Sequence, residues 1–212
     1  MSAAETLELL DWKRRIFALY AAVRAETDPN VAWKLWRSTR DELYRSHPQS
    51  PLEPDARAGF AGLDYFDYDP ALRLATKLVD APPEADELPV SRDAPIRFRR
   101  LGTLDVELAG SARRLEAYWL DAYGGGLFLP FRDATSGDET YGGGRYLLDT
   151  VKGADLGERD GELVLDFNFA YHPSCVYSVR WACPLSPPAN ALDIPIRAGE
   201  RLPADSSADE AA

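Results

Sequence analysis

The sequence predicts an α+β protein in which an N-terminal helical hairpin is followed by a mostly antiparallel β sandwich or barrel. Over roughly the first 50 residues, apolar side chains recur at three- and four-residue steps, which is the period of an α-helix. Further along the chain the period changes to two, as in a strand with one buried face. No alternation of strands with helices follows, which favours an antiparallel sheet over a parallel doubly wound one.

Length and composition indicate a folded chain with a substantial core. The 212 residues are 45% hydrophobic and 11% aromatic, far above the content of a disordered chain. We expect residues 1–50 to form a hairpin packed on the body and residues 51–202 to form a β-rich body that carries any functional site. The small, polar and acidic residues 203–212 are expected to be a disordered tail.

The first predicted helix begins at a capping box, because Ser2 and Glu5 have the required three-residue spacing. Its apolar face is formed by Leu9, Trp12, Ile16, Leu19, Tyr20 and Val23. An aromatic stripe of this kind can grip a ligand, but packing against the rest of the fold is the favoured interpretation.

The second predicted helix begins at Asp28 and Pro29, which suit the N-cap and the first turn. It continues through Trp33, Trp36 and Leu43. The His47-Pro48 pair ends it, because a proline disfavours helical backbone in the residue before it.

Strands are predicted where polar and apolar residues alternate or where short apolar runs lie between turns. The alternation covers Leu72, Leu74, Thr76 and Leu78, and again Leu104, Val106 and Leu108. Further strands are expected over residues 96–101, 115–120, 127–131 and 163–171, with Gly- or Pro-containing turns between them.

Charge and targeting signals narrow the possible partners and the location. The formal net charge of −11 disfavours binding to nucleic acid or to an anionic membrane. The sequence shows no signal peptide and no apolar run of membrane-spanning length, which predicts a cytoplasmic protein. It does not indicate the oligomeric state.

A polar, glycine-rich stretch over residues 131–146 follows a predicted apolar strand and is the first candidate site. Arginine side chains bind carboxylates and phosphates through forked donors, and glycines let backbone N–H groups turn toward a ligand. The candidate ligand-binding residues here are Arg132, Ser136, Thr140, Gly143, Arg145 and Tyr146, with Asp133 and Tyr141 as candidate catalytic residues. The alternative is a tight surface loop whose arginines pair with neighbouring carboxylates.

The predicted strand 163–171 provides the second candidate site. Alternation places Asp166, Asn168 and His172 on one face and large apolar residues on the other. If the polar face lines a cleft, Asp166 can act as a general base, while Asn168 and His172 can bind a polar group. If it faces solvent, as is ordinary for an antiparallel strand, it has no such role.

The cysteines and histidines do not form a recognisable metal motif. His172, Cys175 and Cys183 supply only three ligands, and His47 is distant in sequence. We therefore predict no metal, no cofactor and two free thiols. Catalysis by a cysteine nucleophile has no local signature in its favour.

The sequence resembles the prokaryotic "domain of unknown function 1684" family over most of residues 12–201. The resemblance rests above all on the motif from Phe131 to Gly137, followed by Thr140-Tyr141 and Gly144-Arg145-Tyr146. Shorter matches include His47-Pro48-Gln49-Ser50-Pro51-Leu52, Leu165-Asp166-Phe167-Asn168, Cys175, Cys183-Pro184, Asn190 and Ala198-Gly199-Glu200. His172 is a departure, since the family is expected to carry Asn there more often. The resemblance implies no reaction, but it favours a functional role for the two polar stretches.

Two hypotheses for the function follow. In the first, the protein is a small-molecule enzyme or binder in which Arg132 and Arg145 hold an anionic or polar metabolite and Asp133 or Asp166 transfers a proton. In the second, it is a noncatalytic structural or assembly module in which arginine–aspartate pairs such as Arg132–Asp133 and Arg145–Asp166 are buried locks. The sequence does not decide between an enzyme and a noncatalytic protein.

Overall fold

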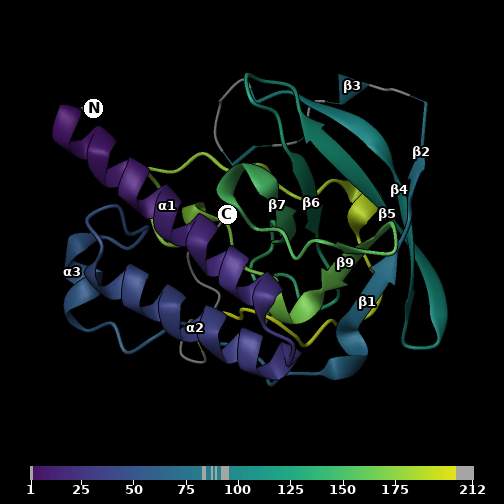
Figure 1. The fold of residues 1–212 in the computed structure, drawn as a ribbon, viewed down its shortest axis with the longest axis horizontal. Coiled ribbons are helices and arrows are strands. Elements are labelled where there is room, and N and C mark those ends of the chain that lie inside the picture. Colours follow the sequence, from purple (N-terminus) through teal and green to yellow (C-terminus); the bar gives the residue numbers. More distant parts are fainter. Residues whose placement is uncertain (1, 83–84, 87, 89, 92–95, 204–212) are drawn as a thin grey trace.

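The computed structural model describes residues 2–82, 85, 86, 88, 90, 91 and 96–203. Apart from Pro203, the predicted tail lies outside the described residues. Figure 1 shows two long helices lying side by side along a β-rich body. This arrangement confirms the predicted α+β class.

The two long helices, α1 (Ala3–Ala25) and α2 (Pro29–Ser46), form the predicted hairpin. Ser2 caps α1: its hydroxyl accepts a hydrogen bond from the Glu5 N–H, while the Glu5 carboxylate accepts one from the Ser2 N–H. Asp28 caps α2, accepting hydrogen bonds from two backbone N–H groups of the first turn. Both predicted helix starts are confirmed.

Shorter helical segments connect the remaining elements. A single-turn helix, α3, spans Pro54–Ala58. Short 3-10 turns span Pro70–Leu72, Thr150–Lys152, Phe167–Phe169, Ser174–Val176 and Pro188–Asn190. Within the described part of the chain, no helix has both the length and the apolar character needed to cross a membrane.

The larger sheet has six strands among the described residues, in the order β2-β4-β5-β6-β7 with β3 also paired to β4. All its pairings are antiparallel. The strands are β2 (Leu78–Asp80), β3 (Ala85–Asp86), β4 (Phe98–Leu108), β5 (Ser111–Leu120), β6 (Leu127–Phe131) and β7 (Arg145–Asp149). The strands predicted at 115–120 and 127–131 are therefore confirmed as parts of β5 and β6.

The smaller sheet contains β1 (Arg73–Thr76), β9 (Glu162–Asp166) and β8 (Glu158–Arg159), in the order β1-β9-β8. Its pairings are also antiparallel. The two sheets form a sandwich-like body, and the described strands do not close into a barrel. Of the two predicted architectures, the sandwich is the one observed.

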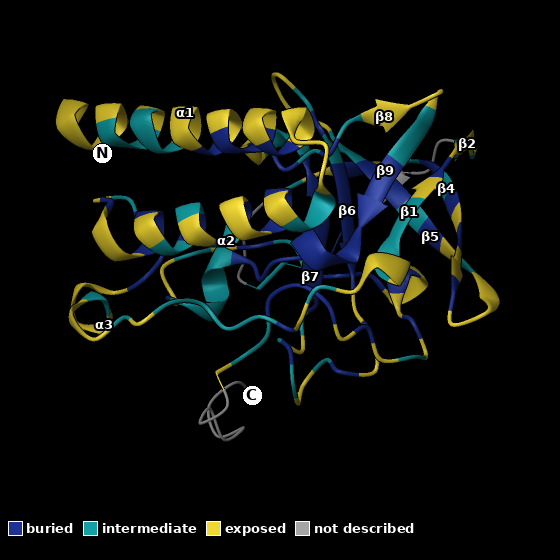
Figure 2. Cartoon of the chain, turned by 60° about the horizontal axis from the view of Figure 1, so that its bottom comes forward, coloured by how far each residue is buried: buried dark blue, intermediate teal, exposed yellow. Residues whose placement is uncertain are grey.

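Two apolar clusters hold three layers together. The first lies between the hairpin and the larger sheet and includes Trp33, Trp36, Tyr118, Phe128 and Tyr146. The second lies between the two sheets and includes Leu104, Leu115, Leu129, Phe131 and Leu165. Figure 2 shows the result, with exposed residues on the outer faces of the helices and buried residues where helices meet strands.

Two strand predictions within residues 72–108 were wrong about where one strand ends and the next begins. The strands predicted at 96–101 and 104–108 are parts of the single long strand β4, which begins only at Phe98 and contains a register shift between Arg100 and Gly102. The bulge stands where Gly102 passes β2, and a Cβ there would lie 2.3 Å from the Val79 carbonyl oxygen. The predicted run from Leu72 to Leu78 begins in the 3-10 turn Pro70–Leu72 and is then divided between β1 and β2, which belong to different sheets.

The predicted strand 163–171 ends early, at Asp166. The Asp166 carboxylate accepts a hydrogen bond from the Asn168 N–H at 3.0 Å, which turns the backbone into the 3-10 turn Phe167–Phe169. The simple alternation of faces beyond Asp166 was therefore wrong. No strand was predicted from the sequence at β7, which contains Arg145 and Tyr146.

Candidate functional site

A small cavity lies between the hairpin and the segments that precede β8 and follow β9. Its volume is about 60 Å³, enough for several water molecules or a small organic anion. The helices contribute Trp12, Ile16, Tyr20, Arg40 and Tyr44. Lys152, Tyr171, His172 and Ser174 line the other side. Aromatic rings surrounding a few polar groups are typical of ligand sites.

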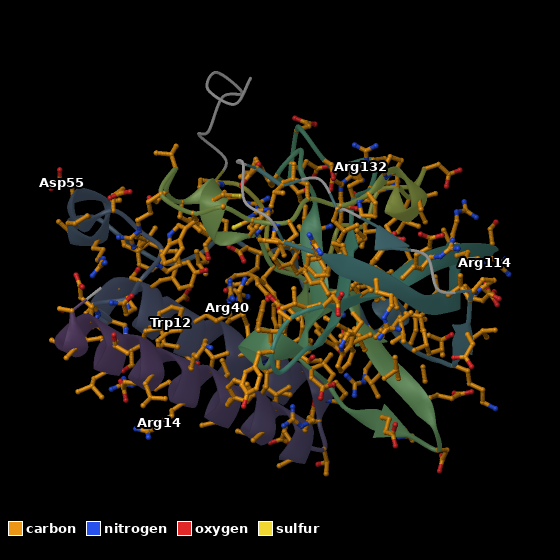
Figure 3. All side chains as sticks on the ribbon, turned by 90° about the horizontal axis from the view of Figure 1, so that it is seen from above. Trp12, Arg14, Arg40, Asp55, Arg114 and Arg132 are labelled. Atoms are coloured by element: carbon orange, nitrogen blue, oxygen red, sulfur yellow. The ribbon has the colours of Figure 1, made fainter. Side chains whose placement is uncertain are left out.

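Arg40 is the charged centre of this cavity. Its Nη2 donates to the Glu200 Oε2 atom at 2.6 Å, and the two side chains are only 7% and 1% exposed. Its Nε atom donates to the Tyr65 hydroxyl at 3.3 Å. The guanidinium also lies 4.7 to 5.2 Å from the ring centres of Trp36, Tyr44 and Tyr171. Arg40 is thus held by charge, hydrogen bonds and aromatic faces. Figure 3 shows Arg40 near Trp12, well away from Arg132.

Glu200 connects Arg40 to His172. Its Oε2 atom accepts a hydrogen bond from the His172 N–H at 3.1 Å. Burial alone would raise the pKa of Glu200, but the charge of Arg40 and the hydrogen bonding of His172 outweigh it and lower that pKa. The Oε1 atom is buried without a hydrogen-bond partner among the described residues. Arg40 and His172, the two side chains that pair with this carboxylate, both line the cavity.

His172 is held as a neutral ring. Its Nε2 atom accepts a hydrogen bond from the Tyr141 N–H at 3.3 Å, which assigns the ring proton to Nδ1. The Nδ1 atom lies 3.7 Å from the Glu200 Oε1 atom, too far for a good hydrogen bond. Burial lowers the pKa of His172 and outweighs the opposing influence of Glu200, while Arg145 and Arg40 lower it further.

We expect the His172→Asn variant to lose part of the pH dependence of folding stability. The pKa of His172 lies below its ordinary value of 6.5 only in the folded state. As pH falls below 6.5, the unfolded chain therefore takes up a proton before the folded one, and wild-type stability decreases by at most ~1.4 kcal/mol per pH unit. Urea unfolding between pH 5 and pH 7 measures the slope.

The control for this prediction is His47→Asn, which removes the other histidine and leaves His172 in place. We expect it to retain the slope that His172 produces. Equal slopes in wild type and His172→Asn over the same pH range would contradict the neutral, buried state of His172.

The candidate residue Arg145 is enclosed at the start of β7. Its Nη2 atom donates to Asp133 Oδ2 and to the Ile196 carbonyl oxygen, each at 2.8 Å. Its Nη1 atom donates to the carbonyl oxygens of Ala198 and Glu200. The side chain is 1% exposed. Arg145 therefore fixes the backbone of the segment that carries Glu200.

Asp133 is the carboxylate partner of Arg145 and organises the turn that follows β6. Its Oδ1 atom accepts hydrogen bonds from the Thr135 N–H and hydroxyl at 2.7 and 2.6 Å. The Asp133 N–H donates to the Ser136 hydroxyl at 3.1 Å, and the hydroxyls of Thr135 and Thr140 lie 2.9 Å apart. The side chains of Asp133, Ser136 and Thr140 thus form hydrogen bonds with neighbouring groups of the protein.

The other candidates in residues 131–146 lie in different surroundings. Arg132 is exposed, and its backbone pairs with the segment around Ala191. Gly143 packs closely, since a Cβ there would lie 2.4 Å from the Tyr141 ring. The buried Tyr146 hydroxyl donates to the Pro184 carbonyl oxygen at 2.6 Å. The structure therefore does not bring these side chains together around one space.

Asp166 and Asn168 are both fully buried. Asp166 pairs with Arg73 at 2.9 Å, and burial raises its pKa although Asn168 and Arg73 oppose that shift. The Asn168 side chain accepts a hydrogen bond from the Asp69 N–H and donates to the Asp69 carbonyl oxygen. Neither residue lines the cavity, but His172, on the same predicted face, does.

Sequence reasoning missed Arg40 and Lys152 and singled out Glu200 only as part of a family motif. A signal for Arg40 was present, because positions 36, 40 and 44 follow one another at four-residue steps on the buried face of α2. A charged residue between Trp36 and Tyr44 on that face requires a buried partner. Within the described residues, no group of three or more His, Cys, Asp or Glu side chains is arranged to hold a metal ion.

The fold and the cavity define an α+β protein with a small cavity, lined by both apolar and polar side chains, between a helical hairpin and a β sandwich. The chain belongs to the family described as "Protein of unknown function (DUF1684)", whose model matches residues 58–201. This confirms the resemblance found in the sequence. Lys152, Tyr171, His172 and Glu200 fall within the matched range, whereas Arg40 and the hairpin precede it.

The chain is also similar to a solved structure, that of an uncharacterised protein of Haloarcula marismortui determined by NMR in solution. The two are 39% identical, with a TM-score of 0.58, and the match covers 80% of this chain and 91% of the other. No curated protein matches the chain.

Proposed function

We propose that this protein binds a small anionic or polar molecule in the cavity lined by Arg40, Lys152 and His172. The observation that carries the proposal is the buried guanidinium of Arg40, which opens onto a space large enough for a small ligand. A buried charge needs a partner, which Glu200 supplies here, and a perturbed charged group that lines a cleft is a candidate for a functional site.

The chemistry of the cavity wall supports an anion over a cation. Arg40 and Lys152 both line it, whereas their carboxylate partners, Glu200 and Asp149, do not. Lys152 is 49% exposed, so it can reach a ligand that enters from solvent. Tyr44 and Ser174 add hydroxyl groups that can donate hydrogen bonds to carboxylate or phosphate oxygens.

In this proposal the stretch over residues 131–146 does not contact the ligand but holds the segment that positions Arg40. The Arg145–Asp133 pair anchors the carbonyl oxygens of Ile196, Ala198 and Glu200. The Glu200 carboxylate in turn holds Arg40. Arg145 and Asp133 would thus affect ligand affinity through the position of Arg40 rather than by touching the ligand.

Lys152→Gln is expected to weaken binding of small anions about tenfold, which corresponds to ~1.4 kcal/mol. The substitution removes one positive charge from the cavity and leaves the buried Arg40–Glu200 pair intact. The measurement is thermal stabilisation of wild type and variant by acetate, malonate and inorganic phosphate, since a ligand that binds only the folded state raises the melting temperature.

Three controls complete this test. Acetamide is a neutral analogue of acetate and is expected to stabilise the protein less. Lys77→Gln removes an exposed lysine outside the cavity and is expected to bind as wild type does. Arg132→Gln tests the alternative site at 131–146. If Arg132→Gln abolished stabilisation while Lys152→Gln left it unchanged, the cavity proposal would be wrong.

Native mass spectrometry beside denaturing mass spectrometry tests the same proposal without a chosen ligand. A mass difference in freshly purified wild type that is absent from Lys152→Gln would identify the molecular mass of a retained ligand. A mass difference that persisted in Lys152→Gln and disappeared in Arg132→Gln would indicate that the ligand binds at residues 131–146 instead.

The second candidate function is a noncatalytic structural or assembly module. The observation that favours it is that Arg145, Asp133, Asp166 and Asn168 bond to other parts of the chain. The pairs differ from those expected, because Arg145 pairs with Asp133 and Asp166 with Arg73. A wild-type protein that carried no ligand and gained no stability from any of the anions would support this function.

A further inference from the structure

Cys175 and Cys183 lie together beside the cavity, although neither belongs to its lining. Both are free thiols. Cys175 lies in the 3-10 turn Ser174–Val176 and is partly exposed, whereas Cys183 is 3% exposed. Cys175 is therefore the more accessible residue of the two, and Cys183 is covered.

Several contacts hold the two cysteines in place. The side chains of Cys175 and Cys183 interact with each other, because each shifts the pKa of the other. The Cys175 sulfur lies 3.9 Å from the Tyr141 hydroxyl. The backbone of Cys183 is fixed by Ser91, whose hydroxyl accepts a hydrogen bond from the Cys183 N–H at 2.9 Å and whose N–H donates to the Cys183 carbonyl oxygen at 2.9 Å.

These contacts make the two thiols chemically unequal. The hydrogen bond from Cys183 lowers the pKa of Cys175 to about 6, with smaller contributions from Ser91 and Tyr141 against the effect of burial. The same hydrogen bond and burial raise the pKa of Cys183. The thiolate is the reactive form of cysteine, and these opposite shifts favour it at Cys175 rather than at Cys183.

We propose that Cys175 and Cys183 form a site of reversible oxidation by hydroperoxides, with Cys175 as the attacking sulfur and Cys183 as the resolving one. A partly exposed cysteine next to a buried one is the arrangement that such a site requires. The proposal is independent of the ligand in the cavity.

The reaction balances with a hydroperoxide as the oxidant. The Cys175 thiolate attacks the terminal oxygen of the peroxide, the O–O bond breaks, and Cys175 becomes a sulfenic acid while the other oxygen leaves as hydroxide or alkoxide and takes up a proton. The Cys183 sulfur then attacks the Cys175 sulfur, an S–S bond forms and the S–O bond breaks, and the hydroxyl of the sulfenic acid takes up the Cys183 proton and leaves as water. Both sulfurs are oxidised and the peroxide is reduced; a low-molecular-weight thiol restores the pair.

The experiment uses hydrogen peroxide, followed by thiol alkylation and peptide mapping under nonreducing conditions. In native wild type we expect both cysteines to lose their reactivity toward alkylation and to appear in one disulfide-linked peptide pair, with the intact mass reduced by two hydrogen atoms. Dithiothreitol should restore both thiols. Two alkylated cysteines after peroxide, or a disulfide only between separate chains, would overturn the proposal.

Two single substitutions assign the roles of the sulfurs. Cys183→Ser is expected to stop at the sulfenic acid on Cys175, which dimedone labels. Cys175→Ser should leave Cys183 largely unoxidised, because its thiol is covered and protonated. Dimedone labelling of Cys183 in Cys175→Ser at the wild-type rate would contradict the assigned roles. Circular dichroism verifies that each variant is folded. The peptide map of the wild type tests disulfide formation without the variants.

Discussion

Replacing Arg145 with methionine is expected to lower the free energy of unfolding by about 3 to 5 kcal/mol, the usual loss when one partner of a buried ion pair is removed. The Asp133 carboxylate would remain buried without its cation. The carbonyl oxygens of Ile196, Ala198 and Glu200 would also lose their donor. Methionine has nearly the same reach as the aliphatic part of arginine, so a cavity contributes little to the loss. Urea unfolding followed by tryptophan fluorescence measures it.

Asp133→Asn and the double variant separate the charge from the hydrogen bonds. If the ion pair dominates, the double variant is expected to be less destabilised than the sum of the two single variants. Arg132→Ala is the matched control, because Arg132 is exposed in the same stretch, and we expect a change within about 0.5 kcal/mol. An Arg145→Met variant as stable as Arg132→Ala would contradict the anchoring role of Arg145.

Glu200→Gln is expected to lower the free energy of unfolding by about 3 kcal/mol at neutral pH. Arg40 would remain buried among aromatic rings without a charged partner. The pKa of Glu200 is lowered below its ordinary value of 4.5 by Arg40 and His172 in spite of burial. The stabilisation is therefore present above pH 4.5 and is lost as pH falls through the lower pKa of the folded state.

The difference between wild type and Glu200→Gln should accordingly shrink on acidification below pH 4.5. Arg40→Met combined with Glu200→Gln removes both charges and is expected to show a coupling of about 0.5 to 3 kcal/mol between the two sites. Additive losses across pH, with no coupling, would indicate that the two groups do not form the pair described.

The sequence predicted those elements whose formation depends on local signals. Both helix starts rest on side chains within three residues of the helix, Ser2 with Glu5 and Asp28 with Pro29, so a local pattern was sufficient. The two ends of β6 were predicted for a similar reason, since a short apolar run lies between two turns. Elements fixed by distant partners were not predicted. β7 contains Arg145, which the local sequence places in a loop. Its partners are backbone carbonyl oxygens in residues 196–200, about 50 residues later in the chain.

The candidate site was only partly predictable for the same reason. His172 and the family motif around Glu200 were recognised as polar groups, but their surroundings depend on a helix more than 100 residues earlier in the chain. Arg40 looks like an exposed helical arginine unless the burial of its face is considered together with its charge. The polar residues over 131–146 were predicted as a site because many of them lie in one short stretch. Most of their polar atoms, however, form hydrogen bonds with other groups of the protein.

The most direct test of the cavity proposal is an NMR titration of the protein, with its arginine and lysine side chains labelled with ¹⁵N, against acetate and then inorganic phosphate. We expect the Arg40 Nε and Lys152 Nζ signals to shift in a saturable manner, whereas the exposed Arg132 Nε signal does not move. Saturable shifts at Arg132 with none at Arg40, or no saturable shift at either, would contradict the cavity proposal.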